Sequence, residues 1–203
     1  MSRVRTRPTR DDTCEKLFEA AARVFEEQGI GGASIEVIAA AAGLTRGAFY
    51  SNFKSKDELI IAMLEDHVEQ SIGRIRDLLE KHRNLADFID ALKTMDRSQQ
   101  DPLGRSPLLH MEMILFVARA EKRRPELAKR LRARRKLVTD IIETTARNSG
   151  RTTILNPTWA GSLVLALEDG FRLHRLIDPE TTPADSFLRA IGDLQRAMGI
   201  SSA

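Results

Sequence analysis

The chain has 203 residues, of which 42% are hydrophobic and 30% charged, and its formal net charge is +3 at pH 7. This balance is ordinary for a soluble globular protein of one or two domains, and it excludes a protein embedded in a membrane. The single cysteine, Cys14, excludes an intrachain disulfide and a zinc cluster built on cysteines.

The N-terminus is a basic arm, residues 1–10, with four arginines and no acidic residue: Arg3, Arg5, Arg7 and Arg10. Such an arm suits contacts with DNA phosphates or a minor groove. A solvated tail is the alternative interpretation. The arm lacks the apolar segment of a secretory signal, and no stretch of the sequence is apolar enough to span a bilayer. We therefore expect a cytoplasmic protein with no membrane partner.

A helix-turn-helix pattern follows the arm. An apolar stripe over Asp11 to Gln28 predicts a first helix, and an alanine-rich helix from Ile35 to Ala42 runs into Gly43. Gly43 can take the positive φ that ends a helix, and the hydroxyl of Thr45 can cap the next one. That next helix, Thr45 to Phe53, is expected to enter the major groove of DNA.

The short helix of this motif has an inward and an exposed side. Ala48, Phe49 and Phe53 are expected to face the core. Small and hydrogen-bonding residues remain, and these suit contact with the DNA backbone and base edges. The residues expected to contact DNA, from this helix and the start of the next, are Thr45, Arg46, Gly47, Tyr50, Ser51, Asn52, Lys54 and Lys56.

A long helix begins after this motif. Ser55, with Glu58 three residues later, forms a capping box, and the apolar spacing continues to about His82. The ammonium of Lys56 and the free amides of the first turn are expected to meet the same DNA phosphate. Residues 11–56 are therefore assigned to a DNA-binding domain.

The remaining residues, 57–203, continue as helices with clear start signals and no sustained period-two alternation. The helices expected here are Asn84 to Met95, Leu108 to Glu121, Pro125 to Arg147, Pro157 to about Ile177, and Thr182 to about Met198. The predicted fold class is all-α, with an N-terminal helix-turn-helix head, a C-terminal helical bundle and about nine helices.

These residues give the chain a resemblance to the TetR (tetracycline-repressor) family of bacterial transcription regulators. The matching features are Ala22, Phe25 and Gly29 at the first helix, the pair Ile38 and Ala39, the turn from Gly43 to Gly47, Tyr50 and Phe53 at the close of the recognition helix, and Ser55, Lys56, Glu58 and Leu59. Asn52 departs from the pattern, because the family more often has histidine or tyrosine there. The specific match covers about the first third of the chain.

The resemblance implies a homodimer that binds a palindromic operator in double-stranded DNA, more often as a repressor. The helix from Pro157 to Ile177 is apolar all round and must be covered on both sides. One face, with Trp159, Leu163, Leu167 and Gly170, is expected to look into the body. The residues expected at the dimer interface are Ala160, Val164, Phe171, Phe187, Ile191 and Leu194. A monomeric core completed by the last two helices is the alternative.

The resemblance also implies a small-molecule effector that binds within residues 57–203 and releases the DNA, and we expect this effector to be mainly apolar. Methionine and aromatic side chains make adaptable cavities, and they make ordinary cores as well. The candidate pocket residues are Met63, His67, Phe88, Leu92, His110, Met113, Phe116, Trp159 and Leu163.

An enzyme is the rival class, and the sequence offers little for it. It has no phosphate-binding loop, and His67, His82, His110 and His174 fall on separate helices without the spacing of a metal motif. We expect no catalytic residue, metal or cofactor. The predicted function is a ligand-responsive regulator of transcription, and a helical architectural DNA-binding protein without ligand control is the alternative.

Overall fold

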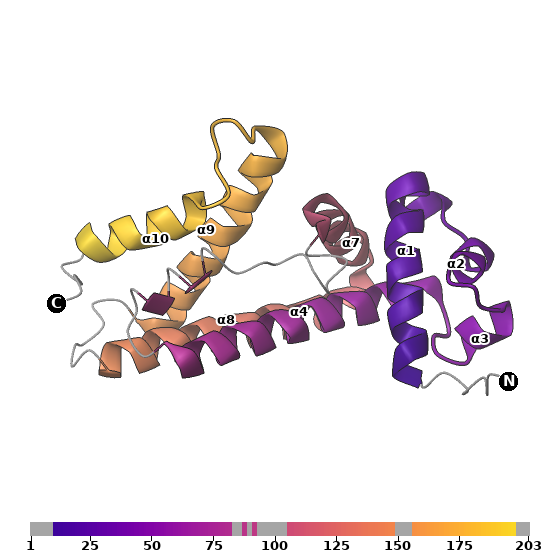
Figure 1. Cartoon of the computed structure of the whole chain (residues 1–203), viewed down its shortest axis with the longest axis horizontal. Coiled ribbons are helices and arrows are strands. Elements are labelled where there is room, and N and C mark those ends of the chain that lie inside the picture. The colour runs from indigo at the N-terminus through magenta and orange to yellow at the C-terminus, as the bar shows by residue number, and fades with distance from the viewer. Residues whose placement is uncertain (1–9, 83–86, 89–90, 93–104, 149–155, 198–203) are drawn as a thin grey trace, which may run out of the picture. The chain divides into compact units, whose positions relative to one another are not determined.

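The computed structural model describes residues 10–82, 87–88, 91–92, 105–148 and 156–197, and this part of the chain contains helices and no strand (Figure 1). The helices are α1 (Arg10–Gly32), α2 (Ile35–Ala41), α3 (Arg46–Tyr50), α4 (Lys56–Lys81), α7 (Pro107–Arg119), the short 3-10 helix η1 (Glu121–Arg123), α8 (Arg124–Asn148), α9 (Pro157–Ile177) and α10 (Ser186–Ala197). The predicted all-α fold class is confirmed.

Two predicted segments fall largely outside these residues. Of the helix expected from Asn84 to Met95, only residues 87–88 and 91–92 are described, and all four are helical. Nine of the ten residues assigned to the basic arm are also outside the description, and Arg10 already belongs to α1.

The chain forms two compact units. The first contains Met1–His67 and Ser98–Arg124, and the second contains Val68–Arg97 and Pro125–Ala203. The domain boundary expected after residue 56 lies inside the first unit, because that unit continues to His67. The unit also includes α7, which packs against α1.

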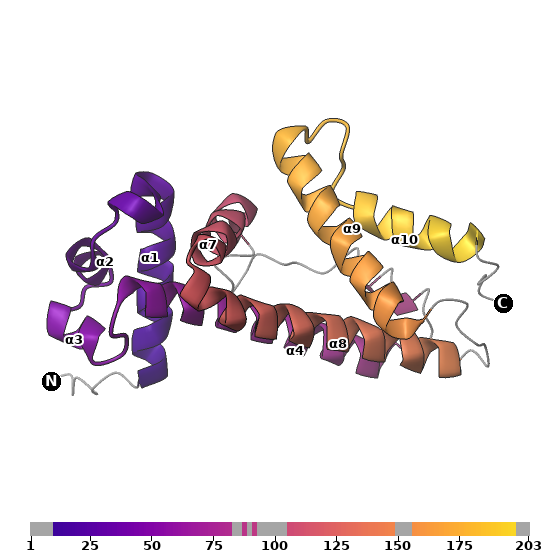
Figure 2. The same ribbon diagram turned by 180° about the vertical axis from the view of Figure 1, so that it is seen from behind.

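In the head, α2 and α3 lie together beside α1 (Figures 1 and 2). Leu17, Ala21 and Phe25 of α1 are almost completely buried and supply the core of this region. Gly29 interrupts α1 with φ 70° and ψ 158°, after which the helix resumes for a few residues. The predicted end at Gln28 therefore marks the kink rather than the last helical residue.

The turn between α2 and α3 has the predicted local chemistry. Gly43 has a φ of 67°, which a residue with a Cβ rarely adopts. The Thr45 hydroxyl oxygen accepts a hydrogen bond of 3.1 Å from the amide of Ala48, so it caps α3. Phe49 is fully buried and Phe53 nearly so, which anchors the short helix from its inner side. The predicted helix-turn-helix head is confirmed.

The capping box at the start of α4 is present in a shifted form. The Ser55 hydroxyl oxygen accepts from the Glu58 amide at 3.1 Å. The Glu58 carboxylate accepts from the amide of Lys54 at 2.7 Å, one residue before the cap. Both bonds satisfy amides that have no partner within a helix.

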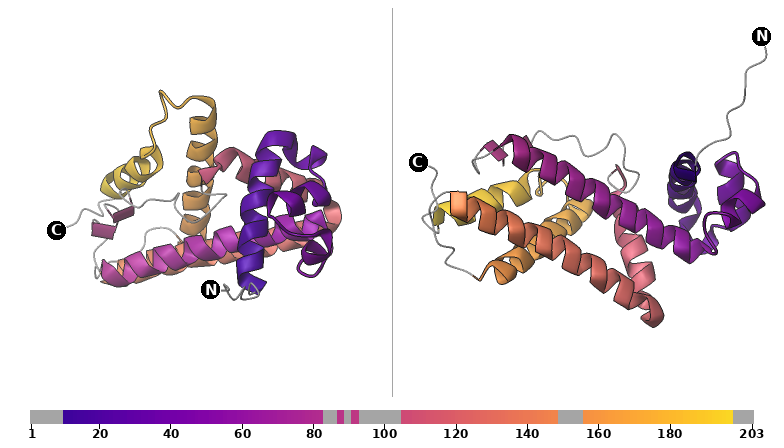
Figure 3. Two further views of the ribbon diagram at one scale, coloured as in Figure 1. Left: turned by 45° about the vertical axis from the view of Figure 1, so that its right-hand side comes forward. Right: turned by 90° about the horizontal axis from the view of Figure 1, so that it is seen from below.

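In the second unit, α9 lies against α8 and packs on α10, which Figure 3 shows from two further sides. Gly161 and Leu165 of α9 are buried, and the Thr139 hydroxyl donates to the Pro157 carbonyl oxygen at 3.5 Å. The inward face of α9 is therefore the one that carries Gly161 and Leu165. This differs from the predicted face, whose Trp159 is 61% exposed.

Candidate nucleic-acid interface

The outer side of α3 presents most of the predicted DNA contacts to solvent. Of that set, Thr45, Arg46, Gly47, Tyr50, Ser51 and Lys54 are exposed. The Tyr50 ring packs edge-on against Phe49, with the ring centroids 5.6 Å apart, and its outer part remains accessible. The Ser51 hydroxyl donates to the carbonyl of Gly47 at 2.9 Å. The buried ring of Phe49 thus supports the polar outer surface of α3.

Gly47 leaves this surface open. A Cβ placed there would meet nothing closer than the Thr45 hydroxyl oxygen at 3.8 Å, and the backbone of Gly47 has no positive φ. Neither the fold nor the backbone conformation therefore requires glycine at this position. A glycine does permit another molecule to approach the backbone closely.

Arg46 is held by two neighbours on the same surface. Its Nε lies 3.2 Å from a Glu36 carboxylate oxygen, and its guanidinium carbon lies 5.5 Å from the centre of the Tyr50 ring. The hydrogen bond with Tyr50 and then the charge of Glu36 raise the pKa of Arg46. Sequence reasoning missed Glu36, because it belongs to α2 and no local spacing links it to Arg46.

Asn52 is turned toward the interior of the head. Its amide nitrogen donates to the Ala48 carbonyl at 2.9 Å, and its amide oxygen lies 3.7 Å from the Cys14 sulfur, which donates to it. The side chain is half-buried, whereas the sequence predicts it on the exposed side. Burial is also the main cause that raises the pKa of the Cys14 thiol.

Lys56 is likewise engaged within the protein. Its ammonium donates to the carbonyl oxygens of Ile30 at 2.6 Å and Ala33 at 2.7 Å. The sequence predicts that this ammonium contacts a DNA phosphate. In the structure without DNA, it binds these two carbonyl oxygens instead. Lys54, two residues earlier, is exposed.

The candidate pocket residues divide between the two units. Met63, His67, His110, Met113 and Phe116 belong to the first unit, and Phe88, Leu92, Trp159 and Leu163 to the second. The rings of His67 and His110 lie 4.4 Å apart between centroids. Met63, His110 and Met113 are buried, whereas Trp159 is largely exposed. The structure thus brings together the histidines from α4 and α7.

The predicted dimer residues lie on the exposed and half-exposed sides of α9 and α10. Ala160, Val164, Phe171, Phe187 and Ile191 are half-buried, and Leu194 is exposed. The C-terminal part of α9 adds Leu173, Leu176 and Ile177, of which Ile177 is 75% exposed. The sequence indicated an apolar helix here, but Leu173, Leu176 and Ile177 were not among the residues predicted at the interface. Leu173, Leu176 and Ile177 have the i, i+3, i+4 spacing of one helix face, and exposed apolar residues that share a face are typical of an interaction site.

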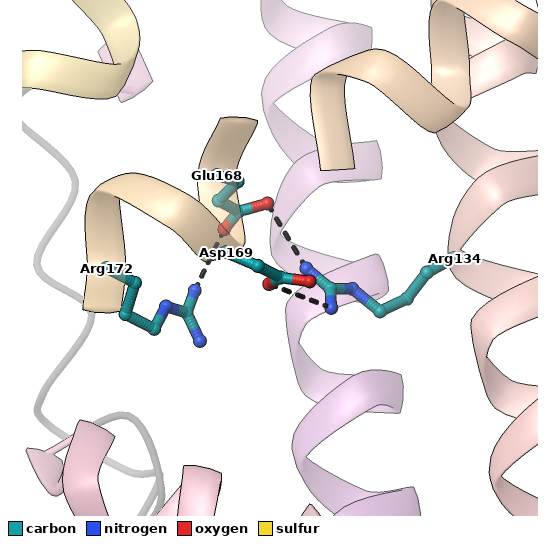
Figure 4. A network of polar contacts seen from close by, with 4 residues as sticks. All are labelled: Arg134, Glu168, Asp169 and Arg172. Carbon is teal, nitrogen blue, oxygen red and sulfur yellow. Dashed lines mark hydrogen bonds and ion pairs between the residues drawn. The ribbon is translucent and has the colours of Figure 1, made fainter. Parts of the chain in front are cut away.

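An ion-pair network joins α8 to α9 in the second unit (Figure 4). The Arg134 guanidinium lies 3.2 Å from a Glu168 oxygen and 3.7 Å from Asp169, and Arg172 donates to the other Glu168 oxygen at 2.9 Å. The four-residue spacing of Glu168 and Arg172 is visible in the sequence, but the partner on α8 is not. These ion pairs join α8 to α9, so their role is structural.

In the described part of the chain, the histidine, cysteine and acidic side chains form no group of three or more that could hold a metal ion. None of the helices in this part of the chain combines the length and the apolar character needed to cross a membrane.

Two family models match the chain. Residues 17–63 match the model described as "Bacterial regulatory proteins, tetR family", and residues 83–197 match "Tetracyclin repressor-like, C-terminal domain". Among curated proteins, the transcriptional repressor KstR2 of Rhodococcus jostii is 30% identical over 123 residues, covering 58% of this chain and 60% of its own length. The matches span between 23% and 60% of the length of the first four such relatives.

Solved structures share the fold over most of the chain. The structure of SmeT with triclosan has a TM-score of 0.70 at 22% identity, covering 91% of this chain and 90% of that one. FadR of Bacillus subtilis with stearoyl-CoA has a TM-score of 0.63 at 15% identity, covering 89% and 95%. At these identities the likeness concerns the fold alone.

Proposed function

Because the chain belongs to the TetR family of bacterial regulatory proteins, we propose that it regulates transcription as a homodimer that binds a palindromic operator. A small, mainly apolar effector releases the DNA, and the regulator acts as a repressor. The observation that carries this proposal is the exposed polar surface of α3. The buried Phe49 anchors this helix from its inner side, and no protein atom crowds the outer side at Gly47.

The side chains of α3 suit contact with duplex DNA. Tyr50 offers a hydroxyl to a phosphate, and Arg46 offers a guanidinium to the major groove, where arginine pairs with guanine in a bidentate manner. Gly47 lets the DNA backbone come close to α3. In the absence of DNA, the carboxylate of Glu36 orients the Arg46 guanidinium through their ion pair.

A two-fold assembly supplies the second head. The half-buried and exposed apolar residues of α9 and α10, among them the half-buried Val164 and Ile191, form the surface proposed to meet its copy in a partner subunit. A dimer of this kind binds two half-sites about one helical turn of DNA apart, roughly 34 Å, or a multiple of it.

An apolar effector is supported by likeness to related proteins. SmeT has been seen with triclosan and FadR of Bacillus subtilis with stearoyl-CoA, both with large apolar parts. In this chain, Met63 on α4 and Met113 on α7 are buried. Each lies within four residues of a histidine of the same helix, and the rings of these histidines, His67 and His110, contact each other. Methionine is the side chain that adapts most readily to varied apolar partners.

DNA recognition is tested by selecting duplexes from a random-sequence pool with the purified protein and mapping the protected bases. We expect an inverted repeat that is bound roughly a thousandfold or more tightly than random DNA. Arg46→Ala should cost about 1 to 3 kcal/mol and relax the preference at one base pair per half-site. Tyr50→Phe should weaken binding to all duplexes similarly, and Arg76→Ala, an exposed arginine of α4, serves as the control.

Two outcomes would contradict the proposal. Equal affinity for all duplexes would indicate an architectural DNA-binding protein without an operator. Unchanged affinity in both Arg46→Ala and Tyr50→Phe would remove the assignment of α3 as the recognition helix.

Effector control is tested by a thermal-shift screen of apolar compounds, followed by titration of each hit into the protein bound to its selected duplex. A compound that prefers the DNA-free form of the protein should lower the affinity for DNA by between about 5- and 150-fold. Bound DNA should lower the affinity for the compound by the same factor. Compounds that raise the melting temperature and leave DNA affinity unchanged would identify a cavity without a switch.

A further inference from the structure

The Lys56 side chain joins the first turn of α4 to the connection between α1 and α2. Its ammonium donates to the Ile30 and Ala33 carbonyl oxygens at 2.6 and 2.7 Å, and the contact is partly buried. These lengths are typical of charge-assisted hydrogen bonds. Since an ammonium has three N–H donors, two of the three are used within the protein.

The two carbonyls lie where the chain changes direction. Gly29 kinks α1, Ile30 belongs to the helical turns that follow the kink, and Ala33 precedes Ser34, the residue that caps α2. Carbonyl groups at the end of a helix lack partners within it, and a cation beside them is favourable. Lys56 therefore fixes the point from which α2 begins.

The turn of α4 that carries Lys56 is itself held in place. Asp57, the next residue, forms an ion pair with Arg123 of η1. The Arg123 guanidinium also lies 5.6 Å from the centre of the Phe116 ring on α7. All of these residues belong to the first unit. The first turn of α4 is thus a fixed support on which Lys56 can hold the α1–α2 connection.

We propose that Lys56 is a positioning residue for DNA recognition. Its ammonium holds the α1–α2 connection on α4, so that α2 and α3 are presented to DNA in one arrangement. The inference rests on the proposed DNA-binding function. Lys56 acts on DNA through α2 and α3, whereas the exposed Lys54 is the nearby lysine that contacts a phosphate.

The first test uses the full-length protein without DNA. Hydrogen exchange of the amides of residues 30–42 is compared in the wild type, Lys56→Met and Lys54→Met. Lys56→Met should accelerate exchange in this segment more than in the rest of the head, because the connection loses its tie, and Lys54→Met should not. Unchanged exchange in this segment, or an equal acceleration throughout the head, would overturn the proposal.

The second test measures affinity for the selected duplex between about 50 and 200 mM salt, at a temperature where each variant is folded. Lys56→Met should bind roughly tenfold more weakly, as expected if the competent arrangement is populated about a tenth of the time. Its slope of log affinity against log salt should equal that of the wild type. Lys54→Met should reduce the slope by about 0.9 for each phosphate that the lysine neutralises in the wild type. The same reduction in Lys56→Met would assign Lys56 to a phosphate and overturn the proposal.

A second variant keeps the proposal testable if Lys56→Met does not fold. Lys56→Gln retains two N–H donors without the charge, so it should keep more affinity than Lys56→Met and the slope of the wild type. A lowered slope in Lys56→Gln would overturn the proposal. If the wild-type protein binds no duplex, the proposed function fails, and the exchange measurement still decides whether Lys56 holds the connection.

Discussion

Replacing Gly161 with alanine is expected to lower the free energy of unfolding, although alanine is the better helix former. A Cβ at this position would lie 2.7 Å from the Thr139 hydroxyl oxygen and 3.3 Å from two backbone atoms of α8, the Arg135 carbonyl oxygen and the Thr139 amide nitrogen. The hydroxyl can rotate away, but the backbone atoms move only if α8 shifts against α9. Overpacking of this kind costs about 1 to 3 kcal/mol.

The helix propensity of alanine offsets part of this loss, because it favours alanine over glycine by about 1 kcal/mol. We therefore expect Gly161→Ala to lower the free energy of unfolding by about 1 kcal/mol. Gly73 on α4 is the matched control, since nothing lies within 4 Å of the Cβ it lacks. Gly73→Ala should raise the free energy of unfolding by up to about 1 kcal/mol.

Urea denaturation followed by far-UV circular dichroism measures both effects. The protein concentration must be held constant, because association makes the apparent stability depend on it. In a Thr139→Ala background, the shortest contact is absent and the destabilisation caused by Gly161→Ala should shrink. If Gly161→Ala stabilised the protein as much as Gly73→Ala, α8 and α9 would not be closely packed at this point, and the reasoning would be refuted.

Three further predictions concern the network, the thiol and the proposed interface. Glu168→Gln should lower the free energy of unfolding by about 1 to 2 kcal/mol, because two largely covered arginines lose a charged acceptor. Asp140→Asn, in an exposed pair, should leave the urea midpoint nearly unchanged, and equal effects would contradict this. Because burial raises the pKa of Cys14, less thiolate is present at a given pH, so iodoacetamide should alkylate it more slowly than free cysteine at about pH 8. An equal rate would count against the burial of this thiol. Val164→Asp or Ile191→Asp should convert a sedimenting dimer to monomer and weaken DNA binding, since a charge would be buried without a partner. A wild-type monomer that binds the inverted repeat tightly would exclude this interface.

The sequence by itself determined the local architecture of the head. The cap from Thr45 to Ala48, the positive φ at Gly43 and the bond from the Glu58 amide to Ser55 all appear as predicted. Each depends on residues within four positions of one another or on a single backbone conformation. Such features are readable from spacing, because the chain geometry of a helix end fixes which neighbours can meet.

Contacts between residues distant in sequence were decided by the tertiary structure. Lys56 meets carbonyls 26 and 23 residues earlier, and the Asn52 amide meets Cys14 from 38 residues away. The sequence presented Lys56 and Asn52 as groups available to DNA, because both stand among residues that suit such contacts. Their internal partners depend on how α1, α2 and α4 pack, which no local pattern specifies.

The sequence also did not determine which face of α9 packs inward. With apolar residues on every side, the helical period has no single preferred face, so spacing alone cannot say which side meets α8. The structure turns Gly161 and Leu165 inward and leaves Trp159 exposed. The physical reason is the missing side chain of Gly161, which lets the backbone of α8 approach to a distance that any larger residue would prevent.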